Sequence, residues 1–391
     1  MDRAVIVVLT GLTLAACARL DAEQLSDTAS PPRTDLGRYL GQSEVVGQET
    51  VGDAVATTFG GRAGCMRGAP FVASTRDAGA ADLVFFLQGG GACWDDYCLA
   101  VTTAPPGVPR VDILDPELPE NPVADWNVTY LPYCDGSLFV GDADRDDDGD
   151  GVAERQHRGL ANLSAALDLS RETFPDPERV LFVGSSGGGY GALFAVPLLQ
   201  ETYPDAELLV LSDSAVGVAR GSDPAFVQHL VDQWGAAGAL GDVSLDSGHM
   251  TGLLERNLED APDARVAVFS AWYDLIIGDV FLKVPPAAFQ QDVAEETDRL
   301  HAAFPDRYRR FLIDGRMHTT LLGDASGIVG SDLGSVEVPV EDLGALAAIE
   351  LGGLDTTVSA SGMAVHAWVA AFLEGGSLWT DVVDAPGPAP E

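Results

Sequence analysis

An apolar run in the middle of the chain leads directly into a glycine-rich turn and then into an apolar helical segment. Residues 180–183 read Val-Leu-Phe-Val, and residues 184–191 read Gly-Ser-Ser-Gly-Gly-Gly-Tyr-Gly. A strand and a helix can meet at so tight a turn only where the neighbouring residues lack side chains. The pattern therefore predicts strand, turn and helix in succession, with the Ser186 hydroxyl presented near the helix N-terminus.

The spacing fits G-x-S-x-G, the turn that presents a nucleophilic serine in hydrolases. Two other glycine-rich turns fit less well. A phosphate-binding Walker loop requires Gly-Lys-Ser/Thr, and this segment has no lysine. A dinucleotide-binding fingerprint would also follow a strand, but this motif lies mid-chain and such a site does not require Ser186. We therefore interpret Ser186 as a nucleophile.

Short apolar strands and helical segments alternate around this motif. The predicted strands are Leu83–Leu87, Val128–Leu131, Val180–Val183, Leu208–Leu211, Val266–Phe269 and Arg310–Ile313. The predicted helices are Leu160–Phe174, Gly189–Thr202, Pro224–Trp234, Ala287–Phe304 and Ala364–Leu373. This alternation predicts an α/β fold of the α/β-hydrolase-like kind, a mostly parallel sheet with helices on both faces.

Both ends of the chain are predicted to lie outside this domain. Arg3 precedes an apolar run, residues 4–16, that is too short to span a bilayer but typical of a signal peptide. The run ends Leu-Ala-Ala-Cys17, which resembles the lipobox of bacterial lipoproteins. We therefore expect a lipoprotein signal peptide at 1–17, lipidation of Cys17, and export to the bacterial cell envelope with a membrane anchor. A tether at 18–45, one catalytic domain at 46–380 and a disordered Pro-rich tail at 381–391 complete the expected organisation.

The charge balance restricts the partners. The chain has 60 acidic and 22 basic residues, a net charge of −38. Nucleic acid is excluded as a partner because there is no basic surface to displace phosphate counterions. The same charge opposes long polyanionic substrates. A small-molecule or carbohydrate ester is the expected substrate, and the oligomeric state is open.

Four further cysteines accompany Cys17. Export favours pairing Cys65, Cys93, Cys98 and Cys134 in disulfides. Cys93 and Cys98 flank a short loop, so we pair them and assign Cys65 to Cys134. A zinc site is the alternative, but no histidine lies nearby and the spacing differs from that of a zinc finger.

A nucleophilic serine requires a base and an orienting acid, which in this fold follow it in the order Ser, acid, His. Among six histidines, His318 is the best candidate because it lies in a loop after the strand Arg310–Ile313. Asp274 ends the segment that begins with the strand Val266–Phe269, and Asp213 ends another strand and is the alternative acid.

The amides that would stabilise an oxyanion are predicted from a second glycine run. Residues 88–91 read Gln-Gly-Gly-Gly and follow the strand Leu83–Leu87. Hydrolases of this fold combine the amide after the nucleophile with amides of such an earlier loop. Gly90, Gly91 and Gly187 are therefore the expected donors.

Several of these segments together resemble the pectin acetylesterase family, which includes Notum-like carboxylesterases. They are residues 87–93, 133–137 and 184–191, Tyr273-Asp274 and the His318 loop, in the same order over residues 60–320. The resemblance implies an α/β-hydrolase-like fold, no cofactor and hydrolysis of a carboxylic ester. It places the nucleophile at Ser186, the acid at Asp274 and the base at His318. The expected reaction removes acetyl or another short acyl group from a carbohydrate; the alternative is a non-catalytic lipoprotein that binds a glycan or a partner.

Two features depart from the family pattern. Gln88 stands where an acidic residue is common, and Ala92 stands where an aromatic residue is common.

An acidic stretch, residues 142–151, looks inserted, and Asp144, Asp146 and Asp148 alternate in it as oxygen ligands do in calcium loops. The twelfth position counted from Asp144 is Arg155, which cannot replace the glutamate of an EF-hand. A structural calcium site and a solvated acidic loop are equally good interpretations.

Overall fold

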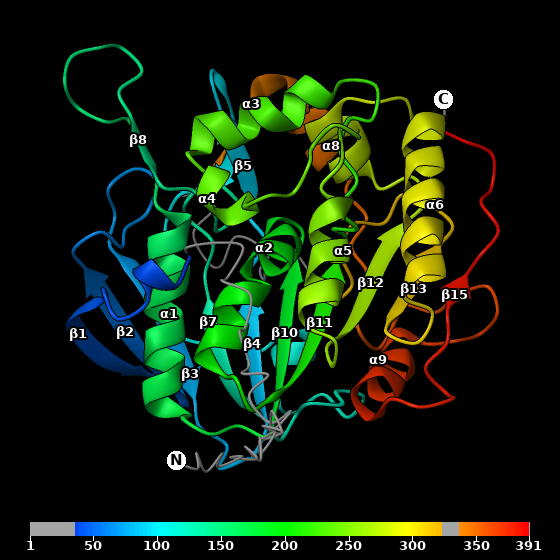
Figure 1. Cartoon of the computed structure of the whole chain (residues 1–391), viewed down its shortest axis with the longest axis horizontal. Coiled ribbons are helices and arrows are strands. Elements are labelled where there is room, and N and C mark those ends of the chain that lie inside the picture. Colours follow the sequence, from blue (N-terminus) through cyan, green and yellow to red (C-terminus); the bar gives the residue numbers. More distant parts are fainter. Residues whose placement is uncertain (1–35, 323–335, 391) are drawn as a thin grey trace, which may run out of the picture. The chain divides into compact units, whose positions relative to one another are not determined.

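The computed structural model describes residues 36–322 and 336–390. In these residues ten strands form one sheet in the order β1-β2-β3-β7-β4-β10-β11-β12-β13-β15 (Figure 1). Their bounds are β1 Glu44–Val51, β2 Ala54–Gly60, β3 Phe71–Arg76, β7 Asn127–Leu131, β4 Leu83–Leu87, β10 Arg179–Ser185, β11 Glu207–Asp213, β12 Arg265–Ala271, β13 Tyr308–Ile313 and β15 Val382–Val383. Pairing is parallel from β7 to β15 and antiparallel among β1, β2, β3 and β7.

The central strands are buried on both faces, which explains their continuous apolar sequences. Along β10, Phe182 belongs to one hydrophobic core and Leu181 to another, because successive side chains point to opposite faces. Helices α1 Gly159–Thr173, α2 Gly187–Thr202, α5 Thr251–Asp260 and α6 Pro286–Ala303 contribute buried side chains to the first core, and α9 Val365–Glu374 to the second. The predicted α/β-hydrolase-like fold class is confirmed.

Shorter elements gather at the carboxyl ends of the parallel strands (Figure 1). These are α3 Pro224–Trp234, α4 Ala237–Leu240, a π-helical segment η3 at Leu275–Leu282, and α8 Leu343–Leu346. A three-stranded sheet consists of β5 Gly91–Trp94, β6 Tyr97–Val101 and β14 Val336–Glu337. The hairpin of β8 Ala143–Arg145 and β9 Arg155–His157 carries the acidic loop, and the 3-10 turns are η1 Leu36–Tyr39, η2 Asp112–Leu114 and η5 Val340–Asp342.

Both predicted disulfides are present. Cys65 is bonded to Cys134 and Cys93 to Cys98. The second bond joins residues that face each other across the β5–β6 hairpin. The four sulfurs are therefore not available as zinc ligands.

The predicted chain ends require two corrections. Folded structure begins earlier than residue 46, because Leu36 is buried and β1 starts at Glu44. The tail is not disordered at 382–387: β15 pairs with β13, and the Gly387 amide donates to Asp314 at 2.8 Å while its carbonyl accepts from Tyr273. The composition of the tail concealed these contacts, which are made by residues distant in sequence. The signal peptide, Cys17 and the rest of the tether lie outside the described residues.

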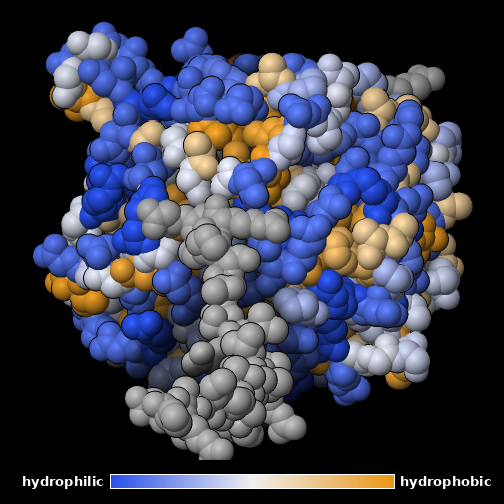
Figure 2. Space-filling view, viewed as in Figure 1, coloured by the Kyte–Doolittle hydropathy of each residue, from blue (hydrophilic) through white to orange (hydrophobic). Residues whose placement is uncertain are grey.

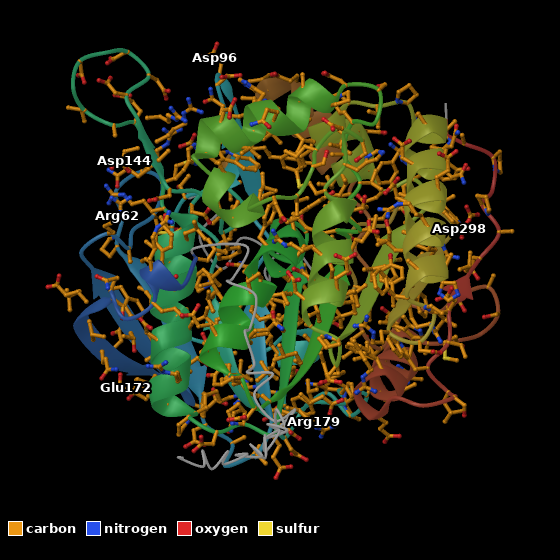
Figure 3. The ribbon with its side chains drawn as sticks, viewed as in Figure 1. Arg62, Asp96, Asp144, Glu172, Arg179 and Asp298 are labelled. Carbon is orange, nitrogen blue, oxygen red and sulfur yellow. A yellow bond between two sulfur atoms is a disulfide. The ribbon has the colours of Figure 1, made fainter. Side chains whose placement is uncertain are left out.

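The surface is polar, as the composition requires. The face shown in Figure 2 is mostly hydrophilic, with apolar side chains gathered below α3. Charged residues such as Glu172, Arg179 and Asp298 lie at the periphery (Figure 3). Within 36–322 and 336–390, no helix combines the length and the hydropathy that a bilayer span needs.

Candidate active site

Ser186 lies at the turn between β10 and α2. Its φ is +54°, a conformation that costs energy for any residue with a Cβ and is characteristic of this turn. The turn is closely packed: a Cβ on Gly184 would come within 2.2 Å of the Gly188 carbonyl oxygen, and one on Gly188 within 2.1 Å of the Leu87 carbonyl oxygen. The glycines of the motif therefore allow the strand and helix to meet where the sequence predicted.

The sheet brings the three predicted catalytic residues to one edge. Parallel pairing places the end of β10 beside β11, β11 beside β12, and β12 beside β13. Asp274 follows β12 and caps η3, with one carboxylate oxygen accepting the amides of Ile276 and Ile277 at 3.0 Å each. His318 follows β13, and its backbone amide donates to the Glu350 carbonyl at 2.7 Å.

Ser186, His318 and Asp274 are connected by hydrogen bonds. His318 Nε2 lies 2.8 Å from Ser186 Oγ, and Nδ1 lies 3.0 and 2.9 Å from the two Asp274 oxygens. All three side chains are buried, with Ser186 8% exposed and Asp274 fully covered. With Nδ1–H donating to the carboxylate, Nε2 is free to accept the serine proton. This geometry is suited to activating a serine nucleophile.

Asp213, the alternative acid, has no hydrogen bond to His318. Its carboxylate accepts the Ser185 hydroxyl at 2.7 Å and the backbone amides of Thr320 and Leu321 at 3.0 and 3.1 Å. Burial raises its pKa, and these hydrogen bonds oppose that shift. Asp213 therefore joins the strand before the nucleophile to the loop after His318, a link that the sequence analysis missed.

The three predicted oxyanion donors lie around Ser186. A Cβ on Gly187 would come 3.1 Å from the Gly91 carbonyl oxygen and 3.7 Å from the Gly90 amide nitrogen, so the two loops are in contact. Gly187 is the first residue of α2, whose first amides have no acceptor within the helix. Gly91 has a φ of +85°, and a Cβ there would meet the Leu99 carbonyl at 1.9 Å. Glycine is therefore required at this position.

The two departures from the family pattern lie beside this loop. The Gln88 side-chain oxygen accepts the Tyr133 amide at 3.0 Å, so an uncharged group fixes the start of the motif at 133–137. Ala92 lines an apolar cavity that opens at Ser186. The small side chain at this position leaves space in the site.

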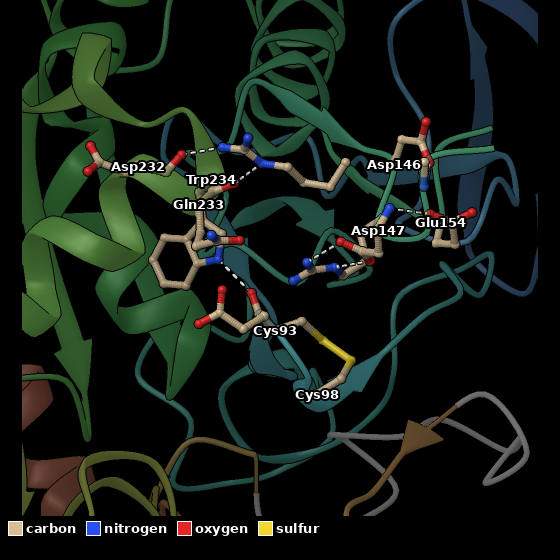
Figure 4. A network of polar contacts seen from close by, with 12 residues as sticks. Cys93, Cys98, Asp146, Asp147, Glu154, Asp232, Gln233 and Trp234 are labelled. Atoms are coloured by element: carbon tan, nitrogen blue, oxygen red, sulfur yellow. Dashed lines mark hydrogen bonds and ion pairs between the residues drawn. A yellow bond between two sulfur atoms is a disulfide. The ribbon is translucent and has the colours of Figure 1, made fainter. Parts of the chain in front are cut away.

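Figure 4 shows the polar contacts of Trp234, whose side chain lines this cavity. Trp234 Nε1 donates to the Cys93 carbonyl at 2.7 Å, next to the disulfide of the β5–β6 hairpin. Arg145 Nε donates to the Gln233 carbonyl at 2.7 Å. The acidic loop, the end of α3 and the cavity wall are thus connected.

The acidic loop changes the predicted calcium ligands. Both oxygens of Asp144 accept from Arg158 at 2.9 Å, and Asp144 lies outside the acidic tip of the loop (Figure 3). The carboxylates that lie within 4.8 Å of one another belong to Asp146, Asp148, Asp150 and Glu154. Counted from Asp146, the Asp residues occupy positions 1, 3 and 5 with Gly151 at position 6, which is the spacing of a calcium loop. Asp144 is therefore replaced by Asp150 and Glu154 in the set that could hold a cation.

The comparisons with known proteins agree with the sequence motifs. A search of curated proteins gave no match. Residues 53–221, which carry Gly90, Gly91, Ser186 and Gly187, match the model of the family Pectinacetylesterase. The match confirms the predicted resemblance to the pectinacetylesterase family over residues 53–221.

Proposed function

We propose that this protein is a serine carboxylic-ester hydrolase that works through an acyl-enzyme. The observation that carries the proposal is the 2.8 Å separation of Ser186 Oγ and His318 Nε2, with Asp274 bonded to the other ring nitrogen. The match of residues 53–221 to the pectinacetylesterase family, whose members hydrolyse carboxylic esters, supports the same reaction. The family name implies an acetylated carbohydrate as substrate, and an acyl group that is short.

In the first half of the reaction, His318 removes the proton of Ser186 as its oxygen attacks the ester carbonyl. Asp274 holds the imidazole in the required tautomer and stabilises the imidazolium that forms. The amides of Gly90, Gly91 and Gly187 receive the negative charge of the tetrahedral intermediate, each donor contributing about 3 kcal/mol. His318 then gives the proton to the alcohol oxygen as the acyl–oxygen bond breaks.

In the second half, His318 activates a water molecule that attacks the acyl-serine. The acid leaves, and Ser186 recovers its proton. One water is consumed and one acid and one alcohol are released, so no cofactor enters the reaction.

A fluorophosphonate probe tests this proposal, because it labels only an activated serine. We expect labelling of the folded protein and its loss in Ser186→Ala. Ser185→Ala is the matched control and should still be labelled, since the Ser185 hydroxyl is bonded to Asp213. Absence of labelling, or labelling that survives in Ser186→Ala, would favour the non-catalytic binding protein instead.

We also propose that the protein is exported and anchored by a lipid on Cys17. The two disulfides support an oxidising compartment, because such bonds are rare in reducing ones.

A further inference from the structure

Two apolar cavities meet at Ser186. The first lies between β5, α3 and η3, and its volume open to the centres of water-sized groups is about 50 Å³. It is lined by Ser186 and Gly187 and by apolar side chains that include Ala92, Trp94, Phe226, Trp234, Ile277 and Phe281. An apolar cavity of about 150 Å³ binds a benzene ring, so this cavity holds roughly two or three carbons.

The second cavity lies on the other side of Gly91 and Phe281, and its volume by the same measure is about 270 Å³. Ser186 and His318 lie in its wall. The remaining side chains that line it are apolar and include Leu99, Val101, Ile276, Val338, Leu346 and Ile349. It is large enough for a ring or a branched alkyl group.

Most polar side-chain atoms of these walls are already bonded within the protein. In the first cavity, the Tyr190 hydroxyl donates to the Val218 carbonyl at 2.8 Å, and Trp234 Nε1 donates to the Cys93 carbonyl. In the second, both nitrogens of His318 are bonded to Asp274 and Ser186. Apart from the catalytic residues and the single N–H of the Trp94 indole, the described lining residues thus offer a ligand no unbonded N–H or O–H group of a side chain.

This lining disfavours a sugar ring in either cavity. Each hydroxyl that is buried without a hydrogen-bond partner weakens binding by roughly 5- to 100-fold. An apolar group gains affinity in the same space, because its surface is removed from water.

The position of His318 indicates which cavity takes the alcohol of the ester and which takes the acyl chain. His318 must deliver a proton to the alcohol oxygen as that oxygen leaves, so the alcohol occupies the cavity that His318 lines. The acyl chain is the remaining substituent of the carbon that bonds to Ser186, and the first cavity is the other apolar space that meets Ser186, so the acyl chain extends into the first cavity.

We propose that the substrate is a carboxylic ester that is apolar on both sides. An acyl chain of about three or four carbons, counted with the acyl carbon, occupies the first cavity, and an alkyl or aryl alcohol occupies the second. This inference rests on the proposed function and replaces the carbohydrate that the family name implies. The bond between the acyl carbon and the alcohol oxygen breaks, water supplies the hydroxyl of the released acid, and the alcohol leaves with the proton from His318.

Two series of esters test the inference. The protein assayed is the purified full chain with both disulfides intact. The 4-nitrophenyl esters of acetate, butyrate, hexanoate and dodecanoate vary the acyl chain alone. Benzyl butyrate and 6-O-butyryl methyl glucoside vary the alcohol between two primary alcohols. We expect kcat/KM to be at least tenfold higher for butyrate than for acetate or dodecanoate, and at least tenfold higher for the benzyl ester than for the glucoside. Preference for acetate or for the glucoside overturns the inference.

A variant that fills the first cavity tests whether this cavity takes the acyl chain. Ala92→Phe places a ring in the first cavity and should lower the ratio of butyrate to acetate turnover at least fivefold. Ala237→Phe is the matched control: Ala237 is exposed and lines a groove beside α3 that does not include Ser186. It should leave the ratio unchanged, and an equal shift in both variants would refute the assignment.

If Ala92→Phe does not fold, inhibition of the unaltered protein by alkylboronic acids gives the same information, since boron bonds to the serine oxygen. Because boron takes the place of the acyl carbon, inhibition should be strongest at ethyl or propyl, and strongest inhibition by methylboronic acid would overturn the inference. The failure of the two proposals is distinguishable. Loss of Ser186-dependent labelling refutes the esterase, whereas labelled protein that prefers sugar esters refutes only the apolar substrate.

Discussion

The Asp213 carboxylate accepts the backbone amide of Thr320 with both of its oxygens, each at 3.0 Å. Thr320 is two residues after His318, and the Ser185 hydroxyl, one residue before the nucleophile, donates to the same carboxylate. The amide of Thr319 is also held, by the Ser214 hydroxyl at 2.8 Å. The strand end at 213–214 therefore sets the distance between the nucleophile turn and the His318 loop.

This relationship separates the effects of the two buried acids. Asp274→Asn should lower kcat about 10³- to 10⁴-fold, because the amide favours the wrong imidazole tautomer. Asp213→Asn keeps Asp274 in place but presents an NH₂ group where backbone amides now donate, so the loop should shift and kcat should fall about 10- to 100-fold. Steady-state kinetics on protein shown to be folded by circular dichroism measures both. Equal losses would mean that Asp213 acts on His318 more directly than its contacts indicate.

The sequence predicted the grouping of the three candidate catalytic residues better than it predicted the surroundings of the site. Ser186, Asp274 and His318 follow strands of a parallel sheet, so strand order alone places them at one edge. The cavity walls could not be predicted, because Ala92, Phe226 and Phe281 belong to elements that only the folded chain brings together.

Features of the local sequence explain why some elements of the structure were not predicted. Residues 275–282 are apolar apart from Asp279, and such a run carries no period that distinguishes strand from helix. Strand β1 is exposed along much of its length, so it lacks the apolar alternation that signals a strand. The hydrogen bonds of Asp213 to the His318 loop could not be predicted either. A carboxylate at a strand end can serve as an orienting acid or as an acceptor of loop amides, and the sequence does not distinguish the two.

The two disulfides should differ in what they support. The Cys65–Cys134 bond spans 69 residues and the Cys93–Cys98 bond spans 5, and in the chain-entropy model these loops contribute about 4 and about 2 kcal/mol to the free energy of unfolding. Paired Cys→Ser variants, compared by urea unfolding, should show the larger loss for Cys65 and Cys134.

The loss of esterase activity should be larger for the Cys93 and Cys98 variant, the opposite of the order expected for stability. The Cys93 carbonyl holds Trp234, which lines the first cavity, so loss of the short bond should disturb the site more. The two activities are compared at a urea concentration where both variants remain folded. If the Cys65 and Cys134 variant loses more activity under these conditions, the hairpin does not support the cavity as inferred.

The proposed anchor is tested by cell fractionation. Cys17→Ser should move the protein from the membrane to the soluble fraction, because acyl chains contribute about 0.8 kcal/mol per buried methylene and two chains suffice for stable anchoring. Ala18→Ser is the control and should remain with the membrane. A Cys17→Ser protein that stays membrane-bound would show that another segment holds it there.

Two buried groups near the motif at 133–137 should give opposite pH dependences of stability. Burial raises the pKa of Asp135 to about 6, while the hydrogen bonds from Ser137 and Phe139 oppose that shift. Burial lowers the pKa of His157 to about 4, although its ring is bonded to the Asp135 carbonyl. Between pH 4 and 6 the folded protein holds the Asp135 proton more tightly than the unfolded chain does, so this group lowers stability as pH rises. His157 does the reverse, because the unfolded chain binds its proton more tightly.

Asp135→Asn isolates the first of these effects. The variant keeps the side-chain oxygen that accepts from Ser137 and Phe139 but carries no charge at any pH. The free energy of unfolding of the variant minus that of the unaltered protein should therefore rise by roughly 2–3 kcal/mol between pH 4 and 6, since one pKa unit corresponds to about 1.4 kcal/mol. Above pH 6 the difference should level off, and the contribution of His157 cancels because both proteins contain it. Urea unfolding at half-unit pH intervals measures the difference, with the exposed Asp96→Asn as the control for net charge. A difference that does not change from pH 4 to 6 would show that Asp135 is ionised in the folded protein as readily as in the unfolded chain.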